Sequence, residues 1–280
     1  MTAELFLIIV TLGVLLAASI SDLRTKEVPD WLNYGFVFAV LGIRALYSFQ
    51  EGWEFLLSGL LGLAVFYLLA LFFYYTNQWG GGDSKLLMGM GAAVGITYPF
   101  DQSSFYLLWF LLALLFAGGA YGLIWLTVVA FRRRHCLLPE LRVMLGKNKT
   151  IHLGVGFASL TLLGAGMVVN SLLLILVFGV ALYYLLLFLV AAQNCCFIAE
   201  KETTSLTEGD WLAEEVIVHG KKLMKKKTLT KKDLEKLRKE NISSVLIKEG
   251  IPFVPCFLIA YLLIVLGKDL IPMIVESALG

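Results

Sequence analysis

Two aspartates at the ends of apolar runs are the residues in this sequence best suited to do chemistry. Asp22 closes the first apolar run, in SISDLRTKEVPD, and Asp83 opens a later one, in GGGDSKLL. Ionisable groups at membrane depth are costly and indicate function by default. Two close carboxylates share a proton, so one is ionised and the other protonated. Such a pair can hydrolyse a peptide bond, because one member activates water while the other polarises the carbonyl.

Helix capping is the simpler interpretation of these acids. An Asp at a helix N-terminus complements the helix dipole and accepts backbone N–H bonds, which would account for Asp83 and for Asp30, at the start of the second apolar run. Asp22 fits this interpretation poorly, because it stands at a helix C-terminus, where the dipole disfavours a negative charge.

Three glycines before Asp83 favour a function beyond capping. Gly80, Gly81 and Gly82 lack a Cβ, so their backbone can take positive φ or approach another chain closely. A plain helix cap does not require three glycines. We therefore expect an active-site turn at which an extended substrate lies beside Asp83.

Other catalytic patterns are weaker in this sequence. The histidines form no H-E-x-x-H motif, no G-x-S-x-G motif is present, and GGGDSK lacks the spacing of a P-loop. The four cysteines form no C-x-x-C pair, so a zinc site is not expected. We predict no metal and no cofactor.

Two other functions also place acids at a membrane. A metal-dependent transferase of lipid-linked phosphates gathers aspartates at the cytoplasmic edge, although usually more of them within one or two helical turns. Activity that is lost on adding a chelator and restored by magnesium would favour this function. A proton-coupled transporter would use Asp22 and Asp83 as a relay, although it would want acids near mid-membrane and broken helices in repeated halves.

The elements that must position these acids are transmembrane helices. The chain has 280 residues, 59% hydrophobic and only 16% charged, and its net charge of +2 gives no case for nucleic-acid binding. Each span needs about 20 apolar residues. The sequence predicts an all-α polytopic membrane protein with about eight spans, six being the alternative. The runs are 4–21, 31–49, 54–75, 85–98, 105–131, 151–169, 171–198 and 251–276.

Lys and Arg near the span ends predict the orientation. Four basic segments alternate with segments poor in base: 22–30, 76–85, 132–150 and 199–250. The basic side is expected to be cytoplasmic, in a multi-pass cell-membrane protein. Asp22 and Asp83 both lie on that side, so they share one membrane depth. The first run has no basic n-region before it, which predicts a retained helix rather than a signal peptide.

Three parts of the chain are expected. Residues 1–198 would form the transmembrane catalytic core, 199–250 a small cytoplasmic α/β domain, and 251–280 the final helix and C-terminus. Within the insertion the sequence predicts a strand and turn, a helix with a capping box at Thr230 and Asp233, and a strand, at 214–222, 230–241 and 243–248. Its lysines form a solvated face or touch anionic membrane lipids.

A glycine stripe predicts close helix packing. Gly91 and Gly95, on the same run as Gly89, have G-x-x-x-G spacing. Gly59 and Gly62 stand on the preceding run. We expect the stripe to pack against the helix that ends at Asp22.

These motifs resemble those of a known family. GGGD fits the G-x-G-D signature with Gly80, Gly82 and Asp83 in the signature positions, and Asp22 followed by VPD resembles the other aspartate region of type IV prepilin peptidases. GDWLAEEV at 209–216 and KEGIPFVPCFLIAYLL at 248–263 are similar to the archaeal branch, which includes the preflagellin (prearchaellin) peptidases.

The resemblance implies an aspartic endopeptidase that removes short basic leaders from pilin-like or archaellin precursors at the cytoplasmic membrane face. Asp22 and Asp83 would be the catalytic pair, and Gly80 and Gly82 would shape the turn. Many bacterial relatives carry paired C-x-x-C motifs and also methylate the new N-terminus. These motifs are missing, so we predict neither zinc nor methyltransferase activity. Glu27 and Asp30 are candidate leader contacts, with solvated loop charges as the simpler interpretation.

Overall fold

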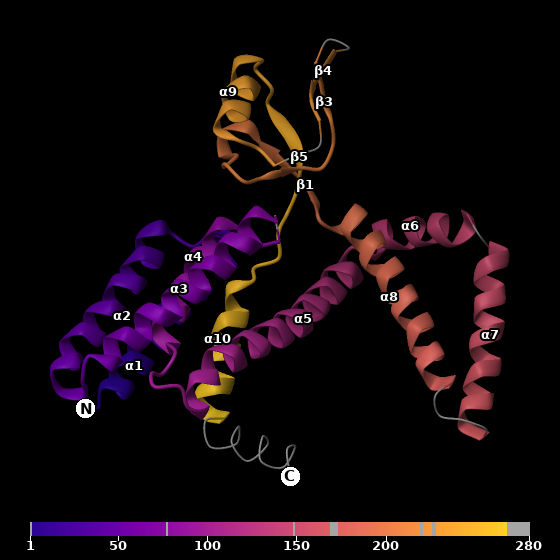
Figure 1. Cartoon of the computed structure of the whole chain (residues 1–280). Helices are drawn as coiled ribbons and strands as arrows, with labels where there is room; N and C mark the ends of the chain where they lie inside the picture. The colour runs from indigo at the N-terminus through magenta and orange to yellow at the C-terminus, as the bar shows by residue number, and fades with distance from the viewer. Residues whose placement is uncertain are drawn as a thin grey trace. The chain divides into compact units, whose positions relative to one another are not determined.

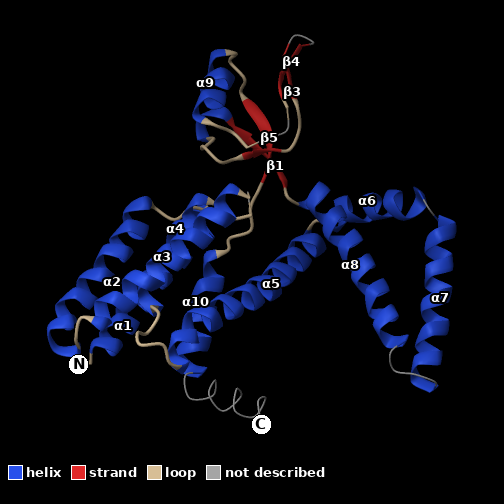
Figure 2. Cartoon of the chain, viewed as in Figure 1, coloured by secondary structure: helices blue, strands red, loops and turns tan. Residues whose placement is uncertain are grey.

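A computed structural model describes residues 2–76, 78–147, 149–168, 173–218, 221–225 and 228–267. The described chain is mostly helical, with a small insertion of strands (Figure 2). It folds as two compact units. The bundle unit comprises the described parts of 1–122 and 251–280, and the insertion unit comprises the described parts of 123–250.

The bundle unit holds the two aspartates. Its helices are α1 (Ala3–Thr25), α2 (Asp30–Glu51), α3 (Glu54–Tyr75), α4 (Gly81–Val94), the short η1 (Gln102–Phe105), the first part of α5 (Tyr106–Arg132), and α10 (Val254–Gly267). Helix α4 packs on α3 and α2, while α1 packs on α2 and α10 (Figure 1). Large apolar side chains such as Phe36, Phe66 and Phe257 form the core between them.

Glycines set the crossing of α3 and α4. A Cβ at Gly62 would lie 2.1 Å from the carbonyl oxygen of Gly91, and a Cβ at Gly91 would lie 2.4 Å from that of Gly62. The close packing predicted from the glycine stripe is therefore confirmed. The partner is wrong, however: the stripe meets α3, and Phe36 of α2 at Gly89, rather than α1. Glycines on both helices let their backbones meet directly.

The insertion unit contains more regular structure than the sequence predicts. After the last part of α5 come α6 (Arg134–Lys147), α7 (Lys149–Val168), α8 (Leu173–Cys196), β1 (Ile198–Glu202), η2 (Thr203–Ser205), β2 (Trp211–Leu212), β3 (Val216–Val218), β4 (Lys221–Met224), α9 (Lys231–Lys239) and β5 (Ser244–Lys248). Strands β1 and β2 both pair antiparallel with β5, and β3 pairs with β4. The sheet and α9 bury their own apolar core, which includes Leu212, Leu237 and Ile247.

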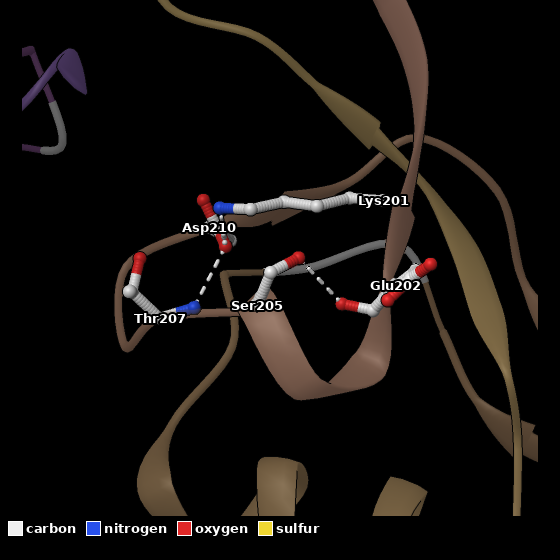
Figure 3. Close-up of polar contacts among 5 residues, drawn as sticks. All are labelled: Lys201, Glu202, Ser205, Thr207 and Asp210. Carbon is white, nitrogen blue, oxygen red and sulfur yellow. Dashed lines mark hydrogen bonds and ion pairs between the residues drawn. The ribbon is translucent and has the colours of Figure 1, made fainter.

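Helix α9 begins at the capping box that the sequence predicts. The Thr230 hydroxyl is bonded at 2.7 Å to the Asp233 carboxylate, which also accepts the Thr230 backbone N–H at 3.1 Å. The loop before β2 is tied in the same local way: the Asp210 carboxylate accepts bonds from the Lys201 ammonium and the Thr207 N–H, each at 2.9 Å (Figure 3). Polar contacts between near neighbours thus stabilise the small sheet.

The number of spans differs from the prediction. Among the described residues, five helices are long and apolar enough to cross a membrane: Ala3–Thr25, Asp30–Glu51, Glu54–Tyr75, Ser103–Arg132 and Val177–Cys196. Helix α4 has 14 residues, about 21 Å at 1.5 Å per residue, which is less than a bilayer core of about 30 Å. The count of eight spans is not confirmed, and residues 268–276 of the predicted last span lie outside the described residues.

Two helix boundaries differ from the prediction. Helix α4 starts at Gly81 rather than 85, because two of the three glycines belong to its first turn. The predicted basic loop 132–150 is wrong over most of its length, since 134–147 form α6. Its Arg and Leu side chains favour a helix, and charge alone does not make a loop.

Candidate active site

Asp22 is buried at the C-terminal end of α1, with 5% of its surface exposed. Its carboxylate oxygen Oδ2 accepts the backbone N–H of Val254 at 2.9 Å. Val254 is the first residue of α10. The positive end of that helix faces the carboxylate and offsets the unfavourable dipole of α1. Asp22 therefore caps a helix that lies 232 residues along the chain.

Asp83 lies partly buried in the first turn of its own helix, α4. Its carboxylate interacts with the backbone N–H of Gly80, the N-cap residue of that helix. This is the capping arrangement that the sequence suggests for an acid at a helix start. Asp83 is thus positioned by residues beside it in the chain.

The turns that carry the two aspartates meet at Val28 and Gly82. An ideal Cβ on Gly82 would lie 3.6 Å from both the backbone nitrogen and the Cβ of Val28. Val28 belongs to the turn between α1 and α2, in which the Ser21 hydroxyl donates to the Glu27 carbonyl at 2.8 Å. The Val28 side chain is buried against Gly82, so the two turns pack directly on each other.

The two carboxylates are near enough for Asp22 to act electrostatically on Asp83. Both also act on the thiol of Cys256, in the first turn of α10. Within the described residues, no group of three or more His, Cys, Asp or Glu side chains is placed to hold a metal ion. The arrangement is a pair of acids at one end of a helical bundle.

Comparison with known proteins shows a similarity to one family over part of the chain. The sequence profile of the type IV leader peptidase family matches residues 9–131, which contain both aspartates and the three glycines. This segment is similar to the type IV leader peptidase family. The preflagellin peptidase of Methanocaldococcus jannaschii is 33% identical over 81 residues, covering 29% of this chain and 34% of that protein.

Two further relatives carry the same description. The preflagellin peptidase of Methanococcus voltae is 29% identical over 113 residues, covering 37% of this chain and 48% of that protein. The preflagellin peptidase of Methanococcus maripaludis is 29% identical over 85 residues, covering 29% of this chain and 35% of that protein. The chain therefore spans about a third to a half of the length of these relatives. No solved structure gives a significant match.

The glycines of the family segment adopt ordinary conformations. Gly80 is extended, with φ −68° and ψ 164°, and Gly81 and Gly82 are helical. The glycines with positive φ in the described chain are Gly52, Gly95 and Gly209, so positive φ is not what the three glycines supply. Their predicted role in an active-site turn stays a prediction, with the Gly82 contact to Val28 as its structural basis.

The predicted leader contacts lie near this end of the bundle. The Asp30 carboxylate forms an ion pair with Lys85 at 2.5 Å, and the Lys85 ammonium also lies 5.3 Å from the centre of the Tyr34 ring. Glu27 is exposed in the turn after α1. Their role as leader contacts stays a prediction. A cationic leader that bound Asp30 would have to compete with Lys85.

Sequence reasoning missed Trp79 and Val254. Trp79, just before the glycines, stacks on Phe73 with ring centres 4.4 Å apart and lies 5.3 Å from Phe253. The position of Trp79 directly before GGGD could have indicated its place beside the site. Val254 acts through its backbone N–H, so its residue type carries no signal. Only the fold brings it to Asp22.

A separate cavity lies at the opposite end of the bundle. Its volume is about 340 Å³, and Glu4, Arg44 and Tyr261 are among its lining residues. The buried Arg44 guanidinium donates to the carbonyls of Phe55 at 2.8 Å and Ala93 at 2.9 Å. Arg44 thus closes the C-terminal end of α4, whereas Asp83 stands at its N-terminal end.

Proposed function

We propose that this chain is an aspartic membrane endopeptidase that removes short basic leader peptides from type IV pilin-like or archaellin precursors. The observation that carries the proposal is that Asp22 acts electrostatically on Asp83 at one end of the bundle, where the turns at Val28 and Gly82 pack on each other. The family of the segment and the names of its relatives support leader processing as the reaction.

Two carboxylates that share one proton can perform both halves of the hydrolysis. The ionised member takes a proton from water as the water oxygen bonds to the peptide carbonyl carbon. The protonated member donates its proton to the carbonyl oxygen. When the tetrahedral intermediate collapses, the leaving nitrogen takes the proton of one carboxyl group and the C–N bond breaks. One hydroxyl of the intermediate gives its proton to the other carboxylate as it becomes the carbonyl of the new C-terminal acid. The carboxylates finish as they began, sharing one proton.

The proposed site faces the cytoplasm. The ends of α1 and α3 and the starts of α2, α4 and α10 gather there. Arg24, Lys26 and Lys85 lie in these helix ends or in the turn beside them. Positive residues favour the cytoplasmic side. A precursor held by its apolar helix in the same membrane would present its leader at this depth. No methyl transfer is part of the proposal.

The test is a cleavage assay in membranes. Wild-type chain, Asp22→Asn and Asp83→Asn are each mixed with a pilin-like precursor, and the products are identified by mass spectrometry. Both variants should lose at least about 100-fold in rate, as removal of a catalytic acid or base does. Asn preserves shape, so thermal unfolding should be unchanged. A normal rate in either variant would overturn the proposal.

A chelator arm separates this reaction from metal-dependent chemistry. We expect the cleavage rate to be the same with and without a divalent-metal chelator. Loss of activity on chelation, with recovery on adding magnesium, would favour the transferase alternative.

A further inference from the structure

The first N–H groups of a helix need partners from outside the helix. In α10, the Val254 N–H finds its partner in the Asp22 carboxylate at 2.9 Å. The backbone N–H of Phe253, one residue earlier, also interacts with this carboxylate. Val254 has 0% of its surface exposed, so this bond is sheltered from water. Two donors on one side of Asp22 fix the direction in which its carboxylate points.

The donors themselves are held rigidly. Pro252 and Pro255 flank them, and each proline ring fixes its φ near −65°. The Phe253 ring lies against Gly118 of α5, where a Cβ would come within 2.6 Å of it. The same ring lies 5.3 Å from Trp79, which directly precedes the glycines of the Asp83 turn. One aromatic contact therefore connects the donors of Asp22 to the region of Asp83.

We propose that the backbone N–H of Val254 is a positioning group of the active site, which holds one oxygen of Asp22 so that the other faces Asp83 and the attacking water. The proposal rests on the proposed function and deepens it. The start of α10 becomes a third part of the site, outside the segment 9–131 that matches the family profile. Other ionisable groups that act with Asp22 here are Asp83, Cys256 and Tyr121.

Val254→Pro removes this N–H and leaves Asp22 itself unchanged. Proline is favoured at the first position of a helix, where its fixed φ suits the fold. Val254→Ala keeps the N–H and removes only side-chain contacts. In the precursor cleavage assay, Val254→Pro should lower kcat by about 10- to 100-fold, the usual effect of losing a hydrogen bond to a charged group. KM should stay within about twofold, and kcat of Val254→Ala should exceed that of Val254→Pro by at least about 10-fold.

Lys231→Pro is the matched control. Lys231 is the first residue of α9, and Thr230 before it is extended, with φ −101° and ψ 165°, which suits a following proline. It lies in the insertion unit and takes no part in the proposed chemistry. Its kcat and KM should equal those of the wild type.

A second variant covers the case in which Val254→Pro does not fold. Gly118→Ala would push the Phe253 ring away and shift the donors without touching Asp22. It should lower kcat and leave KM unchanged. The proposal is overturned if Val254→Pro keeps a normal kcat, or if Val254→Ala loses as much as Val254→Pro. Where Val254→Pro is unfolded, a normal kcat in Gly118→Ala overturns it.

The outcome is separable from that of the proposed function. If Asp22→Asn and Asp83→Asn are inactive while Val254→Pro is normal, the protease assignment stands and the positioning role fails. If Asp22→Asn cleaves normally, the protease assignment fails, whatever Val254→Pro does.

Discussion

Asp83 is held by residues beside it in the chain, whereas Asp22 is held by residues 232 positions away. Asp83 interacts with Gly80, three residues earlier, in the first turn of one helix. Asp22 stands at the last turn of α1 and depends on α10, which follows the whole insertion unit. The two halves of one proposed site are therefore built by local and by long-range structure.

This difference assigns different roles to the surrounding helices. The Asp83 turn needs α4 to stay packed on α2 and α3, which the glycine crossing secures. The position of Asp22 depends on the packing of α10 against α1. A change at the glycine crossing should therefore disturb the bundle as a whole, and a change at the α10 cap should act at one hydrogen bond.

The largest expected effect on stability is at the glycine crossing. In Gly91→Ala the new Cβ would meet the Gly62 carbonyl oxygen at 2.4 Å, and backbone atoms cannot move aside as a side chain can. We expect a loss of about 1–3 kcal/mol, the usual effect of overpacking. Gly119→Ala on α5, where a Cβ meets nothing within 4 Å, is the control and should be neutral or stabilising. Thermal unfolding in detergent measures both, and equal midpoints would contradict the packing account.

A smaller loss of stability is expected when the hydrogen bond from the Val254 N–H to Asp22 is removed. Asp22→Ala removes the acceptor of the Val254 N–H and should cost about 0.5–2 kcal/mol of unfolding free energy. Asp22→Asn keeps an acceptor oxygen and should stay near the wild type, although it is expected to be inactive. Unfolding of the three proteins is compared in one detergent. An Asn variant as unstable as the Ala variant would mean that the negative charge, not the cap, stabilises this end of α1.

The sequence predicts the surroundings of Asp83, which are local, better than those of Asp22, which come from α10. GGGD marks Asp83 because its glycines and its helix start are contiguous. Asp22 is recognisable as an acid at an unfavourable helix end, but the donor that resolves this conflict lies on α10. The glycine stripe predicts close packing, yet only the fold tells that Gly91 meets Gly62.

The insertion unit shows the same division. Helix α9 was predictable because Thr230 and Asp233 cap it locally. Strands β1 and β2 were missed, since β1 has a polar sequence, β2 has two residues, and both depend on pairing with β5. The assignment of 199–250 to a separate cytoplasmic domain stays a prediction.

The central claim is that Asp22 and Asp83 act as one unit, and a double-mutant rate comparison tests it most directly. Residues that act as a unit lose little more when removed together than when removed singly. Single-turnover cleavage of a precursor is measured for Asp22→Asn, Asp83→Asn and the double variant, with thermal unfolding confirming that each is folded. We expect the double variant to keep the residual rate of the slower single variant. A double-variant loss equal to the product of the two single losses, or a normal rate in either single variant, would contradict the account.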